Sequence, residues 1–145
     1  MAAAPSPATA PPFTPPPIPW LAPRALESPP DLGPGLDPQR CADALARLCA
    51  EADVQAVVVF GSRARGEARA DSDLDLAVIL RQPQLSGAEK MACWQRFSRA
   101  LGPLGVGVDL VVAGAADAAR LSSRRLRGWT FWRCWRRSWR GVIER

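Results

Sequence analysis

The 145-residue sequence contains no histidine, and this absence removes several classes of catalytic and metal site at once. Histidine is the usual general base near neutral pH and a common ligand of zinc. Without it, Ser-His-Asp hydrolases and most zinc hydrolases are excluded. A catalytic or metal site in this chain must therefore be built from other side chains.

Cysteine pairs and long apolar runs are also missing. The four cysteines do not form a C-x-x-C motif, so we predict neither a zinc site nor a thioredoxin-like site. Scattered thiols are typical of reduced proteins, and we expect a cytoplasmic location. No apolar run of about 18 residues occurs, and no basic stretch precedes an apolar one at the N-terminus, so we predict no membrane span and no signal peptide.

Proline and charge are distributed unevenly, and this divides the chain. Thirteen of the 15 prolines lie in residues 1–38, a stretch with too few large apolar side chains to form a core. Nine arginines and one acid follow from Arg120 onward, whereas residues 1–119 carry 10 basic and 13 acidic side chains. We therefore predict a disordered extension at 1–36, a folded domain at 37–119 and an Arg/Trp-rich tail at 120–145.

Local patterns in residues 37–145 predict helices and strands in mixed order. Asp37-Pro38 is typical of a helix start, and Ser86 with Glu89 is typical of a capping box. β-branched and apolar runs between turn residues predict the strands. We expect helices at 38–51, 87–101 and 117–139, and strands at 54–60, 74–80, 106–112 and 141–143. This order indicates an α+β fold with a small mixed β-sheet and flanking helices.

Three aspartates stand inside or beside the apolar strands, where an unpaired carboxylate is costly. The two-residue period of a strand places Asp73 and Asp75 on one face, and Asp109 joins them if its strand is adjacent. Clustered carboxylates repel one another unless a cation neutralises them, and oxygen ligands favour Mg²⁺ or Mn²⁺. Two such ions about 3.5–4 Å apart are the standard arrangement for phosphoryl or nucleotidyl transfer.

A second motif lies at the end of the first predicted strand. Gly61 lets the backbone approach a phosphate, and Ser62 lies at the start of a short helix that attracts anions. Arg63 and Arg65 add positive charge beside it. These four residues therefore predict a nucleotide-binding turn next to the predicted metal ligands, although solvated loop arginines are an equally good interpretation of Arg63 and Arg65.

The two motifs together resemble the minimal nucleotidyltransferases of the DNA polymerase β superfamily. The hallmark of that family is Gly-Ser, about ten residues, and Asp-x-Asp, and here ten residues separate Ser62 from Asp73. The resemblance covers about residues 40–117. It implies that Gly61 and Ser62 hold the β- and γ-phosphates, and that Asp73 and Asp75 bind the metals. It also implies that Asp109 completes the second metal site and helps to deprotonate the acceptor hydroxyl.

The resemblance implies an enzyme that transfers AMP from ATP to an acceptor hydroxyl with two Mg²⁺ or Mn²⁺ ions. Small bacterial relatives are often antitoxins that modify a tyrosine of a HEPN-domain toxin, so we expect such a partner. One alternative is a non-catalytic antitoxin that acts by contact. Another is a small-molecule adenylyltransferase similar to aminoglycoside-modifying enzymes.

The tail departs from the pattern of that family. On the predicted helix, Trp132, Trp135 and Trp139 share one face. This face would pack on the sheet, dock a partner protein, or bind nucleic acid or a membrane surface. We favour packing on the sheet, because so small a domain needs its large apolar side chains, and nucleic acid is the less favoured ligand.

Overall fold

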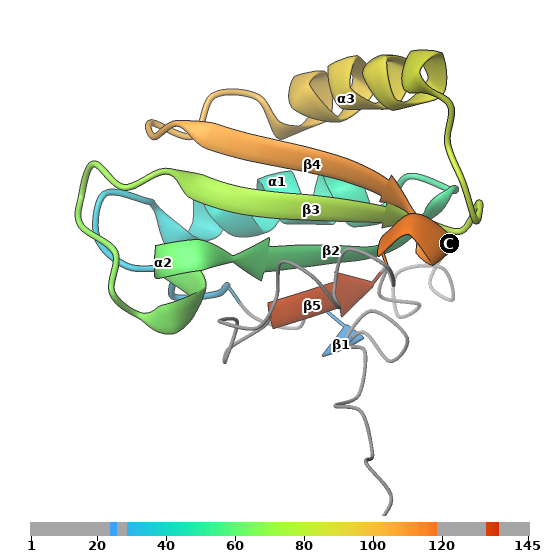
Figure 1. Cartoon of the computed structure of the whole chain (residues 1–145). Coiled ribbons are helices and arrows are strands. Elements are labelled where there is room, and N and C mark those ends of the chain that lie inside the picture. Colours follow the sequence, from blue (N-terminus) through green and yellow to red (C-terminus); the bar gives the residue numbers. More distant parts are fainter. Residues whose placement is uncertain (1–23, 26–28, 119–132, 137–145) are drawn as a thin grey trace, which may run out of the picture.

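The computed structural model describes residues 24–25, 29–118 and 133–136 (Figure 1). Its elements are β1 (Arg24–Ala25), α1 (Pro38–Cys49), β2 (Val54–Phe60), α2 (Gly61–Arg65), β3 (Leu74–Leu80), α3 (Gly87–Leu101), β4 (Val108–Gly114) and β5 (Arg133–Arg136). The strands form one sheet in the order β1-β5-β2-β3-β4. Strand β2 is antiparallel to β5 and β3, whereas β3 and β4 are parallel. The predicted α+β fold with a small mixed sheet is thus confirmed.

Both long helices begin at the caps that the sequence predicts. The Asp37 carboxylate accepts a hydrogen bond from the Arg40 amide at 2.7 Å. The Ser86 hydroxyl accepts from the Glu89 amide at 3.2 Å, and the Glu89 carboxylate accepts from the Ser86 amide at 2.7 Å. These bonds satisfy amides that have no partner within a helix, and so they fix where α1 and α3 start.

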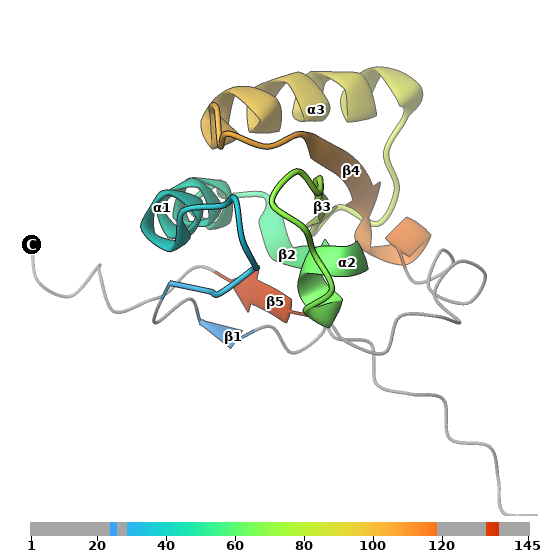
Figure 2. The same cartoon turned by 90° about the vertical axis from the view of Figure 1, so that its left-hand side faces the viewer.

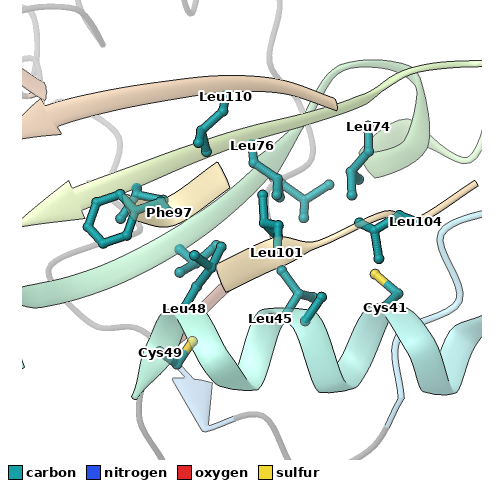
Figure 3. Packing of buried hydrophobic residues seen from close by; sticks show 14 of the residues in the cluster. Cys41, Leu45, Leu48, Cys49, Leu74, Leu76, Phe97, Leu101, Leu104 and Leu110 are labelled. Carbon is teal, nitrogen blue, oxygen red and sulfur yellow. The ribbon is translucent and has the colours of Figure 1, made fainter. Parts of the chain in front are cut away.

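Helices α1 and α3 cover the same face of the sheet (Figure 2). Figure 3 shows leucines of α1 meeting leucines of β3 and β4, with Phe97 and Leu101 of α3 beside them. Arg47 of α1 also donates to the Ala100 and Leu101 carbonyls at the end of α3, at 2.6 and 3.1 Å. This face holds the main hydrophobic core, and side chains on alternate strand positions therefore project from the other face, which we call the second face.

The structure corrects the prediction for the tail. We expected a helix over 117–139, but residues 133–136 form strand β5, which pairs with β2 and aligns Trp135 with Val57. Helical backbone is present at 115–118. Residues 133–136 therefore do not have the helical period of about 3.6 residues that would place the three tryptophans on one face. Trp132, Trp139 and the predicted strand at 141–143 lie outside the described residues.

The structure also corrects the end of the predicted extension. Leu32 and Leu36, which we assigned to a disordered segment, are 3% and 6% exposed and belong to the main core. Residues 29–36 therefore pack as part of the folded unit. Residues 1–23 and 26–28 of the predicted extension lie outside the described residues.

In the part of the chain that the structure describes, every helix is too short or too polar to cross a bilayer.

Candidate functional site

The sheet register brings the three predicted aspartates to one end of neighbouring strands. Asp75 of β3 aligns with Asp109 of β4, and Phe60, the last residue of β2, aligns with Asp75 on the other side. Asp73 lies two residues before Asp75. Since Leu74 and Leu110 point into the main core, the aspartates that alternate with them face the second face.

Two glycines lie in close contact with two of these carboxylates. Gly61, the first residue of α2, has φ +72°, and a Cβ at this position would overlap the Asp75 Oδ2 atom. A Cβ at Gly107, just before β4, would likewise overlap the Asp73 Oδ1 atom. The sequence alone does not indicate Gly107, because only the parallel register of β3 and β4 places it beside Asp73. Both carboxylates therefore depend on neighbouring residues that lack a side chain.

The electrostatic environment couples the aspartates. Partial burial raises the pKa of the Asp75 carboxyl, and the charges of Asp109 and Asp73 raise that pKa further. The Arg65 guanidinium acts in the opposite direction and lowers it. The negative form of Asp75 is thus disfavoured in the protein alone, and a cation placed among these groups would reverse that preference.

This pKa shift predicts how stability depends on pH. The folded protein holds the Asp75 proton more tightly than the unfolded chain does, so stability falls as pH rises above the ordinary Asp pKa of 3.8 and through the raised value. Asp75→Asn removes this titration. In metal-free buffer we expect the melting temperature of the variant to exceed that of the wild type increasingly from pH 4 to 6. A constant difference over this range would contradict the coupling.

Arg65 and Ser62 lie on α2, which starts where β2 ends. The Arg65 Nε atom is 3.0 Å from the Glu67 carboxylate, and both side chains are solvent-accessible. Because Arg65 also influences Asp75, it lies within electrostatic reach of the aspartates. Gly61, Ser62 and Arg65 therefore stay as predicted nucleotide contacts.

Arg63 is different, and here the structure contradicts both interpretations of the sequence. Its side chain is 1% exposed, so it is neither a solvated loop charge nor free to meet a phosphate. The guanidinium donates to four main-chain carbonyls, those of Leu32, Pro34, Arg69 and Ser72. Within residues 29–118 it forms no ion pair. Arg63 therefore links the segment 32–34 to the segment 69–72, beside the site.

The aspartates offer the donor set of a Mg²⁺ or Mn²⁺ site. All ligands would be carboxylate oxygens, which these ions prefer, and the absence of a side chain at Gly61 leaves room for the Asp75 carboxylate. In the described residues no three acidic, cysteine or histidine side chains are placed closely enough to hold an ion as they stand. Mg²⁺ is usually bound by one or two carboxylates together with substrate phosphates, so a bound nucleotide would supply the remaining ligands.

Comparisons with known proteins identify a family. A sequence model described as "Polymerase beta, Nucleotidyltransferase" matches residues 44–121, more than half of the chain. No curated protein matches. A chain of a toxin–antitoxin structure with AMP-PNP is 27% identical, with a TM-score of 0.35. The match covers 48% of this chain and 54% of that chain. A structure of a candidate nucleotidyltransferase from Sulfolobus solfataricus is 20% identical, with a TM-score of 0.41. The match covers 67% of this chain and 94% of that chain.

Proposed function

We propose that this chain, which belongs to the polymerase β nucleotidyltransferase family, transfers AMP from ATP to a hydroxyl group of a partner protein. The acceptor that we propose is a tyrosine of a HEPN-type toxin, which would make the chain its antitoxin. Mg²⁺ or Mn²⁺, in two sites, would assist the reaction.

The proposal rests mainly on the alignment of Asp75 with Asp109 on neighbouring strands. Asp73 precedes Asp75 by two residues and so lies on the same side of the sheet. These three residues would hold the metal ions, which would stabilise negative charge on the phosphates. Gly61, Ser62 and Arg65 would contact the triphosphate. Asp109 is exposed on β4, so an acceptor approaching the second face can reach it.

The proposed reaction is an in-line displacement at phosphorus. The acceptor oxygen forms a bond to the α-phosphorus, and the bond from that phosphorus to the α–β bridging oxygen breaks. Pyrophosphate leaves with the bonding electrons, and Asp109 accepts the hydroxyl proton. Carboxylate bases of this kind need only lie within hydrogen-bond distance of the hydroxyl in the bound complex.

Two labelled forms of ATP test the proposal. The full chain, Mg²⁺ and the product of the neighbouring gene are incubated with ATP that is labelled at either the α- or the γ-phosphate. We expect only the α-label to appear on the partner, and a tyrosine-to-phenylalanine change in the partner to abolish it. Transfer of the γ-label would indicate a kinase and overturn the proposal.

Nucleotide binding has a separate test that needs no acceptor. Because ATP–Mg²⁺ binds only the folded state, a concentration of 100 times its dissociation constant should stabilise the protein by about 2.7 kcal/mol. For a domain of this size, that corresponds to a rise in melting temperature of roughly 10–20 °C. We expect a smaller rise for Asp109→Asn, and Asp117→Asn serves as the control. An unchanged wild-type melting temperature would contradict the nucleotide site.

A further inference from the structure

The segment Leu32–Leu36, here called the strap, lies against the turn 69–72 that leads into β3. Leu32 and Leu36 are buried in the main core at its two ends. Between them, Gly33 and Gly35 have φ values of +92° and +82°. In Figure 1 the blue stretch before α1 runs beside α2 and the loop ahead of β3. The strap is therefore anchored on both sides of its contact with the turn.

The contact is close because the strap glycines lack side chains. A Cβ at Gly35 would overlap the main chain of Ala70, with its carbonyl carbon at 2.7 Å. A Cβ at Gly33 would lie 3.3 Å from the Ala68 methyl and 3.6 Å from the Arg63 guanidinium. Even one methyl group at Gly35 would push the strap and the turn apart.

Arg63 joins the strap to the turn. Its Nη1 atom donates to the Leu32 carbonyl at 2.8 Å and to the Pro34 carbonyl at 3.0 Å. Its Nε and Nη2 atoms both donate to the Ser72 carbonyl, at 3.1 and 2.8 Å. Because the planar guanidinium fixes the directions of its donors, the two segments are held in one relative position.

The turn itself ends directly before the first metal-ligand candidate. The Arg69 amide donates to the Ser72 hydroxyl at 2.8 Å, and the Ser72 amide donates back to the Arg69 carbonyl at 3.1 Å. Asp73 follows at once, and the next amide, Leu74, donates to the Gly107 carbonyl at 2.8 Å. Asp73 is therefore held between a turn that Arg63 fixes and the strand pairing that Gly107 begins.

We propose that Arg63 and the strap are positioning elements of the site: they fix the turn 69–72 and through it the direction of the Asp73 and Asp75 carboxylates. This inference rests on the proposed function only for its effect on nucleotide binding. Groups that orient metal ligands typically change affinity by 10–100-fold when they are altered. The strap would therefore belong to the catalytic unit, although it precedes the family match at residues 44–121.

Gly35→Ala in the full chain tests this inference, with Gly102→Ala as the matched control. Gly102 also has a positive φ, +63°, but no atom lies within 4 Å of its Cβ position. It therefore reproduces the backbone strain without the contact. Arg63→Lys, which keeps the charge and loses the planar donor fork, is the second variant if Gly35→Ala does not fold.

The first measurement is amide hydrogen exchange of the protein without nucleotide. We expect residues 69–75 to exchange about tenfold faster in Gly35→Ala or Arg63→Lys, while the Gly102→Ala variant keeps wild-type exchange there. Exchange in these residues no faster than in the control would overturn the inference. This readout does not depend on ATP, so it tests the strap even if the proposed function fails.

The second measurement is the dissociation constant of ATP–Mg²⁺ by calorimetry, at a temperature where all variants are folded. We expect Gly35→Ala or Arg63→Lys to weaken binding by about tenfold or more relative to Gly102→Ala. Wild-type affinity in the tested variant would overturn the positioning role. Absence of binding by the wild type would instead contradict the proposed function.

Discussion

Replacing Asp75 with asparagine is expected to lower the rate of AMP transfer by about 10³-fold while the protein stays folded. Loss of the ligand charge removes several kcal/mol of transition-state stabilisation, and each 1.36 kcal/mol corresponds to a factor of ten. Asparagine keeps the shape of the side chain next to Gly61, so the contact between α2 and β3 persists. The measurement is transfer of α-labelled AMP to the partner protein under saturating ATP–Mg²⁺.

Asp43→Asn is the matched control for this prediction. Asp43 is an exposed residue of α1, and α1 covers the face of the sheet opposite the aspartates. The control makes the same chemical change without touching the site, and its transfer rate should equal that of the wild type. A folded Asp75→Asn protein with wild-type transfer would show that Asp75 is not a metal ligand.

The two effects of the same substitution should have opposite signs. In the protein without metal, Asp75→Asn removes a carboxylate that Asp109 and Asp73 repel, so stability above pH 4 should rise. In the transfer assay, the same change should remove activity. A substitution that stabilises the fold and abolishes the reaction is the expected behaviour of a functional residue whose charge is unfavourable until its ligand binds.

The parts of the fold that follow local rules were predictable from the sequence. The apolar runs gave strands at 54–60 and 74–80 with the observed bounds, and the caps at Asp37 and Ser86 gave the helix starts. The third strand, expected at 106–112, lies at Val108–Gly114. The bounds of this strand are set by its pairing with β3. The register of that pairing cannot be predicted from the composition of one segment.

The errors concern residues whose environment comes from distant segments. The strap resembles a continuation of the proline-rich extension, because Leu32 and Leu36 become core residues only by packing with apolar side chains of distant helices and strands. Arg63 reads as a phosphate contact because it follows Gly-Ser, yet its four partners are main-chain carbonyls, which every residue possesses. Such partners leave no signal in the sequence.

Spacing also misled the interpretation of the tail. Tryptophans three, four and seven residues apart satisfy a helical period, but pairing with β2 imposes strand geometry on residues 133–136. Long-range pairing can override a local pattern of this length. By contrast, the spacing between Gly61-Ser62 and Asp73 was informative. The ten intervening residues are the end of α2 and the loop that leads into β3, the antiparallel neighbour of β2.

Gly61→Ala is the second substitution for which we expect a large loss, about 100-fold in AMP transfer. Its Cβ would overlap the Asp75 Oδ2 atom, so the carboxylate must move away from the position that the sheet register gives it. A misplacement of about 1 Å at a reacting centre can cost 10²-fold. Alanine at a positive φ adds about 1–2 kcal/mol of destabilisation, which by itself does not move Asp75.

Gly66→Ala separates the effect of displacing Asp75 from the effect of placing alanine at a positive φ. Gly66 ends α2 with φ +76°, close to the +72° of Gly61, but no atom lies within 4 Å of its Cβ position. Both variants should therefore lose similar stability in thermal melts, whereas only Gly61→Ala should lose transfer activity and ATP–Mg²⁺ affinity. Equal activity in the two variants would mean that the contact between Gly61 and Asp75 has no part in the reaction. A selective loss would show that the turn after β2 matters because it leaves space for a carboxylate, in addition to any contact that its amides make with phosphate.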